Sequence, residues 1–174
     1  MIIREAKIKD ISEMARVHVN TWRIAYRGIL PDDILENLSY EKREHSWRQV
    51  FKNAQKDGNF TYIAEDGSGQ IFGFANAGME RLDHQLYQGE LNAIYILKSY
   101  QSKGIGRELV RVVAERLSQI EIHSMLVWVL ADNPACRFYE KLGGKKVNQK
   151  EIKRENTKLI EVAYGWTNTS NLYI

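Results

Sequence analysis

One stretch of the sequence, in which a strand runs through a glycine-containing turn into an amphipathic helix, constrains the fold most. Residues 93–117 read AIYILKSYQSKGIGRELVRVVAERL, and after the turn apolar residues recur at helical spacing. The next apolar segment, SMLVWVLA, is typical of a buried strand. A strand, a helix and a second strand in this order predict a crossover between two parallel strands.

The segments on either side predict antiparallel pairs and further helices. The sequence FTYIAEDGSGQIFGFANAGM predicts a hairpin around its DGSG turn, and KKVNQ with KLIEVAYGW predicts a final hairpin. Helices are expected from Asp10, from near Ser39, and from Pro134 to the LGG sequence. The order β-α-α-β-β-β-α-β-α-β-β predicts one α/β domain of the α+β type, with a mixed, largely antiparallel sheet flanked by helices.

Composition narrows the class of protein. The 174 residues suit one domain, and 25 lysines and arginines against 22 acidic residues give a formal net charge of +3. This excess is too small to argue for nucleic acid, although basic residues cluster in KSYQSKGIGREL and EKLGGKKVNQKEIKR. Cys136 is the single cysteine, and the sequence lacks both a membrane-length apolar run and a signal-peptide pattern. We expect a cytoplasmic protein that needs no metal, nucleic acid or membrane.

The glycine turn suggests an anion site. The first amides of a helix have no intrahelical acceptor, and the helix dipole adds partial positive charge there. Gly104 and Gly106 lack the Cβ atoms that would keep a phosphate away from the backbone, and Lys103 and Arg107 add charge. The turn matches neither a Walker A loop nor a dinucleotide fingerprint, so an ordinary tight turn remains the alternative.

The sequence from Gln101 to Gly106, QSKGIG, resembles the acyl-CoA-binding signature Gln/Arg-x-x-Gly-x-Gly/Ala of the GNAT superfamily of N-acetyltransferases. The resemblance extends upstream to IYIL and downstream to ADNPACRFYEKLGG. It implies a GNAT-like domain over residues 1–168, with splayed central strands, followed by a C-terminal tail at 169–174. It also implies acetyl-CoA as the acyl donor and an amine as the acceptor.

The same resemblance implies the residues that bind the cofactor. Backbone amides of the turn would hold the pyrophosphate, the strand before it would lie along the pantetheine arm, and an asparagine before the last helix would touch the cofactor. The implied residues are Gln101, Ser102, Lys103, Gly104, Ile105, Gly106 and Arg107 for the pyrophosphate, Ile94, Tyr95 and Ile96 for pantetheine, and Asn133. Asn133 also precedes Pro134, where it would serve as a helix N-cap.

Two residues are expected to move protons. An alkylammonium has a pKa near ~10.4, so a base is needed to produce the neutral amine that attacks the thioester. Glu90 is our candidate for a base acting through water, the alternative being a solvated carboxylate at a strand end. Regular alternation would place Glu90, Asn92, Ile94 and Ile96 on one face of their strand. Tyr139 matches the tyrosine that the family uses to protonate the leaving thiolate, the alternative being a packing residue.

The acceptor site is expected near the first helix, from which Trp22 and Tyr26 would bind an apolar or cationic acceptor. Core packing explains both rings equally well. His18, which shares the apolar face of this helix with them, is interpreted as a core residue. Exposed edges of the final hairpin would permit a homodimer. A non-catalytic acyl-CoA-binding regulatory module and a nucleic-acid-binding protein are the competing functions.

Overall fold

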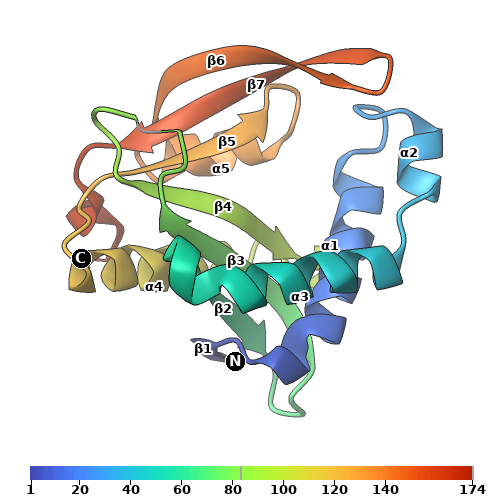
Figure 1. The fold of residues 1–174 in the computed structure, drawn as a ribbon, viewed down its shortest axis with the longest axis horizontal. Coiled ribbons are helices and arrows are strands. Elements are labelled where there is room, and N and C mark those ends of the chain that lie inside the picture. The colour runs from blue at the N-terminus through green and yellow to red at the C-terminus, as the bar shows by residue number, and fades with distance from the viewer. Residues whose placement is uncertain (83, 174) are drawn as a thin grey trace.

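A single sheet runs through the computed structural model, which describes residues 1–82 and 84–173. In this part of the chain seven strands lie in the order β1-β2-β3-β4-β5-β7-β6 (Figure 1). The strands are β1 (Ile2–Glu5), β2 (Phe60–Glu65), β3 (Ile71–Met79), β4 (Gly89–Ile96), β5 (Met125–Leu130), β6 (Lys145–Arg154) and β7 (Thr157–Trp166). All neighbours are antiparallel except β4 and β5, which are parallel, so the predicted mixed, largely antiparallel sheet is confirmed.

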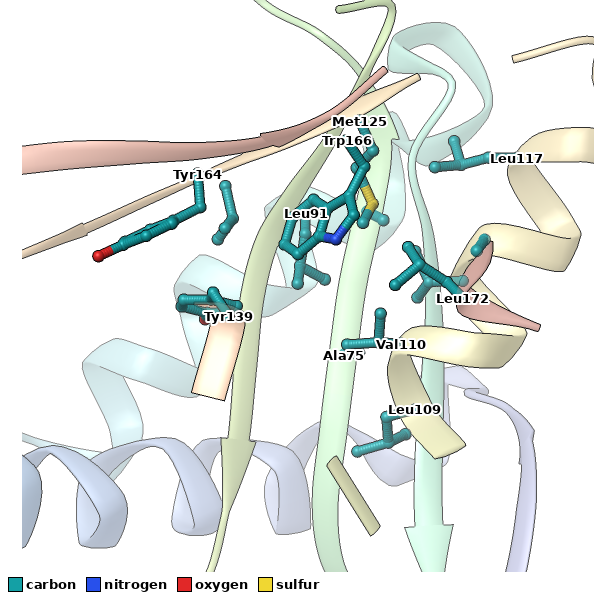
Figure 2. Close-up of a cluster of buried hydrophobic side chains, with 14 of the residues drawn as sticks. Ala75, Leu91, Leu109, Val110, Leu117, Met125, Tyr139, Tyr164, Trp166 and Leu172 are labelled. Carbon is teal, nitrogen blue, oxygen red and sulfur yellow. The ribbon is translucent and has the colours of Figure 1, made fainter. Parts of the chain in front are cut away.

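Helices cover both faces of the sheet. They are α1 (Ile11–Ala25), α2 (Asp32–Glu36), α3 (Tyr40–Asp57), α4 (Ile105–Gln119) and α5 (Ala135–Lys141). Phe74 of β3 packs with α1 and α3. Its neighbour Ala75 packs with α4 (Figure 2). Successive strand residues point to opposite faces, so α1 and α3 lie on one face and α4 on the other. No described helix is long and apolar enough to cross a membrane.

The two parallel strands separate soon after they begin. Only Gly89–Met125 and Glu90–Leu126 are paired, although β4 continues to Ile96 and β5 to Leu130. Beyond Glu90, β4 pairs with β3 on one side alone, which leaves backbone groups along its other edge without a strand partner. The splay of the central strands expected from the family resemblance is therefore present.

A β-bulge in β4 corrects the predicted alternation of side chains. Ala93 lies opposite Asn76 and Leu91 opposite Ala77, so Asn92 is the extra residue. An extra residue reverses which side chains share a face. Glu90 is therefore not on the face of Ile94 and Ile96, which pack towards α4; Tyr95 packs on the opposite face with α1.

The final hairpin extends beyond the predicted segments and contacts the N-terminal half of the chain. Leu159 of β7 is buried with Tyr26, Leu30 and Leu35, the last of which belongs to the short helix α2. Residues 169–172 form a 3-10 helix whose Leu172 packs in the same core as α4 (Figure 2). The division of the chain at residue 168 stays a prediction, and Ile174 lies outside the described residues.

Candidate active site

A cavity of about 520 Å³ opens where β4 and β5 diverge, on the face that carries α1. Its wall combines aromatic rings, aliphatic side chains and both signs of charge. The lining residues are Trp22, Tyr26, Leu30, Ile34, Arg81, Leu82, Glu90, Leu91, Asn92, Tyr95, Trp128, Val129, Leu130, Lys150, Ile152, Arg154, Leu159 and Glu161. A concave space that combines apolar side chains with polar groups is typical of a small-molecule site.

Glu90 is buried in this wall and bound by one arginine. The residue is 2% exposed, and both of its carboxylate oxygens accept hydrogen bonds from Arg81, Nη2–Oε1 at 2.6 Å and Nε–Oε2 at 3.0 Å. The Arg81 side chain is 64% exposed and comes from the β3–β4 loop. The hydrogen bonds that Arg81 donates to Glu90 raise the pKa of Arg81. A buried carboxylate thus depends on a partner that solvent can reach.

A second charged pair lines the cavity on the hairpin side. The Lys150 ammonium lies 3.5 Å from the Glu161 carboxylate and 4.0 Å from the centroid of the Trp128 ring. Buried polar atoms normally have hydrogen-bond partners. Among the lining residues, the indole nitrogens of Trp22 and Trp128 and the Asn92 side-chain oxygen are buried without a described partner. Hydrogen bonding is therefore incomplete in this wall.

The rings at the base of the cavity continue into the core. Trp22 and Tyr26 have centroids 4.7 Å apart, and Tyr95 stacks on His18 at 4.4 Å. His18 Nδ1 accepts a hydrogen bond from Trp47 Nε1, and burial together with the charge of Arg43 lowers the pKa of His18 to about 3. His18 is therefore a neutral core residue at physiological pH, while Trp22 and Tyr26 face the cavity and also pack.

The turn before α4 offers a run of free backbone donors. No hydrogen bond between described residues uses the amides from Ser102 to Arg107. Ser102 and Gly104 have positive φ angles of 62° and 80°, and α4 begins at Ile105. Successive amides in such a turn form a concavity suited to an anion. The Gln101 side chain takes no part in it, since its Nε2 donates to the carbonyl of Ile96.

The two glycines of this turn are required for different structural reasons. The sequence-based interpretation, which explained both by the approach of a phosphate, is corrected here. Gly104 has a left-handed backbone, and an added Cβ would meet no atom within 4 Å. At Gly106 an added Cβ would lie 3.1 Å from Cζ of Phe138 in α5. Gly106 therefore allows α5 to approach α4, whereas Gly104 permits the turn itself.

Tyr139 lies in the core cluster on the α4 side of the sheet, not in the wall of the cavity. It is 4% exposed, and its ring centroid is 6.0 Å from that of Tyr164 and 6.3 Å from that of Trp166 (Figure 2). Burial and the neighbouring phenols of Tyr95 and Tyr26 raise the pKa of Tyr139. The hydroxyl is therefore protonated at neutral pH and lies within electrostatic reach of two cavity residues.

Asn133 and Cys136 have local structural partners. The Asn133 side-chain oxygen accepts a hydrogen bond from the amide of Ala135 at 2.9 Å, as an N-terminal helix cap does. Cys136 is half-buried, and burial raises the pKa of its thiol, so it is a poor nucleophile. Among the described residues no three histidine, cysteine or carboxylate side chains are placed to hold a metal ion.

Sequence reasoning identified part of the cavity wall and missed the rest. The cavity wall brings together four residues singled out from the sequence, namely Trp22, Tyr26, Glu90 and Tyr95. Missed were Arg81, Asn92, Trp128, Lys150, Arg154 and Glu161. A polar Asn92 and a Trp128 inside apolar strands are signals that sequence alone offers, but the loop and hairpin charges give none. Tyr95 was expected at the cofactor, yet its ring packs on the α1 face.

Comparisons with known proteins agree with this architecture. The FR47-like protein family matches residues 75–153. The uncharacterized N-acetyltransferase YuaI of Bacillus subtilis is 39% identical over 170 residues, which cover 98% of this chain and 95% of that protein.

Solved structures share the fold at low sequence identity. The PaiA N-acetyltransferase of Thermoplasma acidophilum, in complex with coenzyme A, has a TM-score of 0.74 at 20% identity, covering 92% of this chain and 96% of that one. YncA of Salmonella typhimurium, a putative acetyltransferase with its cofactor acetyl-CoA, has a TM-score of 0.72 at 22% identity, covering 95% and 92%. With the splayed strands and the glycine turn, this near full-length relationship shows that the chain belongs to the GNAT superfamily of N-acetyltransferases.

Proposed function

We propose that the protein transfers the acetyl group of acetyl-CoA to a primary amine that binds in the cavity beside Glu90. The observation that carries this proposal is the run of unpaired amides at the start of α4, next to the opening between β4 and β5. An anion at these amides and a linear arm along the free edge of β4 would together satisfy backbone groups for which the described part of the chain offers no other partner. The coenzyme A and acetyl-CoA in two similarly folded proteins support this assignment.

The residues fit the groups of the donor. The amides of residues 102–107, with the side chains of Lys103 and Arg107, would bind the pyrophosphate. The free edge of β4 around Ile94, Tyr95 and Ile96 would pair with the pantetheine amides, as an added strand does. Asn133 would add a contact only from its amide nitrogen, because its side-chain oxygen caps α5.

Glu90 would accept the proton of the attacking amine through water. Both of its oxygens bind Arg81 here, so one of them must exchange the guanidinium for water before it can receive a proton. Arg81 is exposed enough to withdraw into solvent. The amine then attacks the thioester carbon, the carbon–sulfur bond breaks, and Tyr139 gives its proton to the departing sulfur.

The test is an acceptor screen that measures free thiol released from acetyl-CoA, with hydrolysis without amine subtracted. We expect amine-dependent thiol release, and mass spectrometry should find one acetyl group added to the acceptor. Glu90→Gln should reduce the rate by about 100-fold, the contribution of a positioned base. Protection by coenzyme A against thermal unfolding, without thiol release from any amine, would instead indicate the non-catalytic binding module.

A further inference from the structure

The charges along the cavity suggest which acceptors it takes. Of the residues that the structure describes, five charged ones line it, and four of these form the pairs Arg81–Glu90 and Lys150–Glu161. The fifth, Arg154, has no ion-pair partner among residues 1–82 and 84–173. The charge left over among these five residues is therefore positive, and an anionic group on a ligand would neutralise it.

Arg154 lies at the opposite end of the cavity from Glu90. Glu90 is opposite Leu126 of β5, and Leu130, further along β5, is opposite Glu161 of β7. From Leu126 to Leu130 the strand rises about 13 Å. Arg154 is opposite Thr157, nearer still to the hairpin turn, so the cavity is elongated along the hairpin.

The wall between these ends is mainly aromatic and aliphatic. Trp22 of α1 and Tyr26, the residue that follows this helix, face the cavity on one side, and Trp128 faces it from β5. Leu159 is buried at the far end, and Ile152 packs with it beside Arg154 on β6. An extended ligand would contact apolar surface along its length and meet charged groups at its two ends.

We propose that the acceptor is an elongated amine with an anionic group more than about 10 Å from the reacting nitrogen, as in an unblocked peptide with an acidic residue near its fourth position. Arg154 binds this anionic group, and the amine lies beside Glu90. This inference rests on the proposed function for the direction of the acceptor, but the binding of the anionic end is measurable without turnover.

Two amidated pentapeptides, Ala-Ala-Ala-Glu-Ala and Ala-Ala-Ala-Gln-Ala, test the inference because they differ in one charge. Their binding to the full chain in saturating coenzyme A is measured by calorimetry at low salt. We expect the glutamate peptide to bind about fivefold more tightly, the size of a solvent-accessible ion pair, and added salt to reduce the difference. A glutamate at the second position should give no such gain.

Arg154→Gln should abolish the preference for glutamate. Lys153→Gln is the matched control, because it removes the same charge from the neighbouring residue, whose side chain points to the other face of β6. Equal affinities in the wild type, no binding of either peptide, or a preference that survives Arg154→Gln would each overturn the inference. Thiol release is measured separately, so acetylation of both peptides with equal affinities would refute this inference and leave the proposed function intact.

Discussion

At the scale of single residues, Glu90 and Tyr139 differ in the kind of side chain that surrounds each of them. Glu90 is a buried carboxylate with a bidentate arginine, whereas Tyr139 is enclosed by the rings of Phe138, Tyr164 and Trp166. A carboxylate paired in this way can exchange its partner, and a phenol in an apolar setting keeps its proton. These are the properties that a base and an acid need.

The general-acid role proposed for Tyr139 predicts a selective effect on turnover. Tyr139→Phe should lower kcat by about 100-fold, because the leaving sulfur loses its proton donor, and should leave the affinity for coenzyme A nearly unchanged. Steady-state kinetics and calorimetry measure the two quantities. Tyr164→Phe is the control, since that hydroxyl donates to Glu140 at 2.8 Å. Full kcat in Tyr139→Phe would remove Tyr139 from the mechanism.

The Arg81–Glu90 ion pair predicts that substitutions of its two residues have non-additive effects on the free energy of unfolding. Arg81→Gln should lower the free energy of unfolding by about 1 kcal/mol, because Glu90 keeps a buried charge without its partner. Glu90→Gln should cost less in the Arg81→Gln background than in the wild type. Urea denaturation of the four proteins gives the coupling energy. Additive effects would mean that the pair does not stabilise the fold.

At the scale of elements, the surface proposed to bind the donor consists of backbone groups that are left unpaired. Among the described residues, the amides of residues 102–107 have no acceptor and β4 beyond Glu90 has no second strand beside it. Both sets of unpaired groups follow from the β4–α4–β5 crossover. In this unit α4 begins after the end of β4, and β5 separates from β4. Side-chain identity matters less here than backbone conformation, so the most informative variants change the backbone.

Gly104→Ala is such a variant, and Gly69→Ala in the β2–β3 turn is its matched control. Both glycines have φ near +80°, 80° and 83°, with no atom within 4 Å of an added Cβ. Each substitution should cost about 1 kcal/mol in urea unfolding through backbone strain. Only Gly104→Ala should weaken coenzyme A binding, by about tenfold, the loss of one hydrogen bond to a charged group. Equal calorimetric affinities would argue against an anion site in this turn.

At the scale of the whole molecule, the core that joins α1, α3 and the sheet contains a histidine that must stay neutral. His18 is buried between Trp47 and Tyr95, and its pKa is lowered to about 3 from an ordinary value of 6.5. The unfolded chain binds a proton at this histidine below pH 6.5, whereas the folded chain does not until about pH 3. Stability is therefore lost as the pH falls through this window.

His18→Gln should reduce that loss. One proton contributes about 1.4 kcal/mol per pH unit, so the wild type should lose roughly 2.5 kcal/mol more than the variant between pH 7 and pH 4.5. Glutamine keeps an acceptor for the Trp47 indole but does not titrate. Urea unfolding at several pH values measures the difference. Parallel stability curves for the two proteins would show that His18 does not cause the acid sensitivity.

The order of strands and helices, the parallel crossover and the glycine turn all follow from the sequence, because periodicity and turn residues are local signals. The bulge at Asn92 was not predictable, since an extra residue in a strand depends on the register with β3. The requirement for glycine at position 106 was not predictable either, because it comes from a contact with Phe138, which is distant in the sequence.

The sequence by itself determined the class of fold, the family and the site where backbone donors are left free. Only the tertiary structure decided which side chains meet across the cavity, because Arg81, Trp128 and Arg154 come from three segments that contact one another through the folded sheet. Burial and charge pairing are properties of that assembly. They made Glu90 a paired carboxylate and left Arg154 without a described partner.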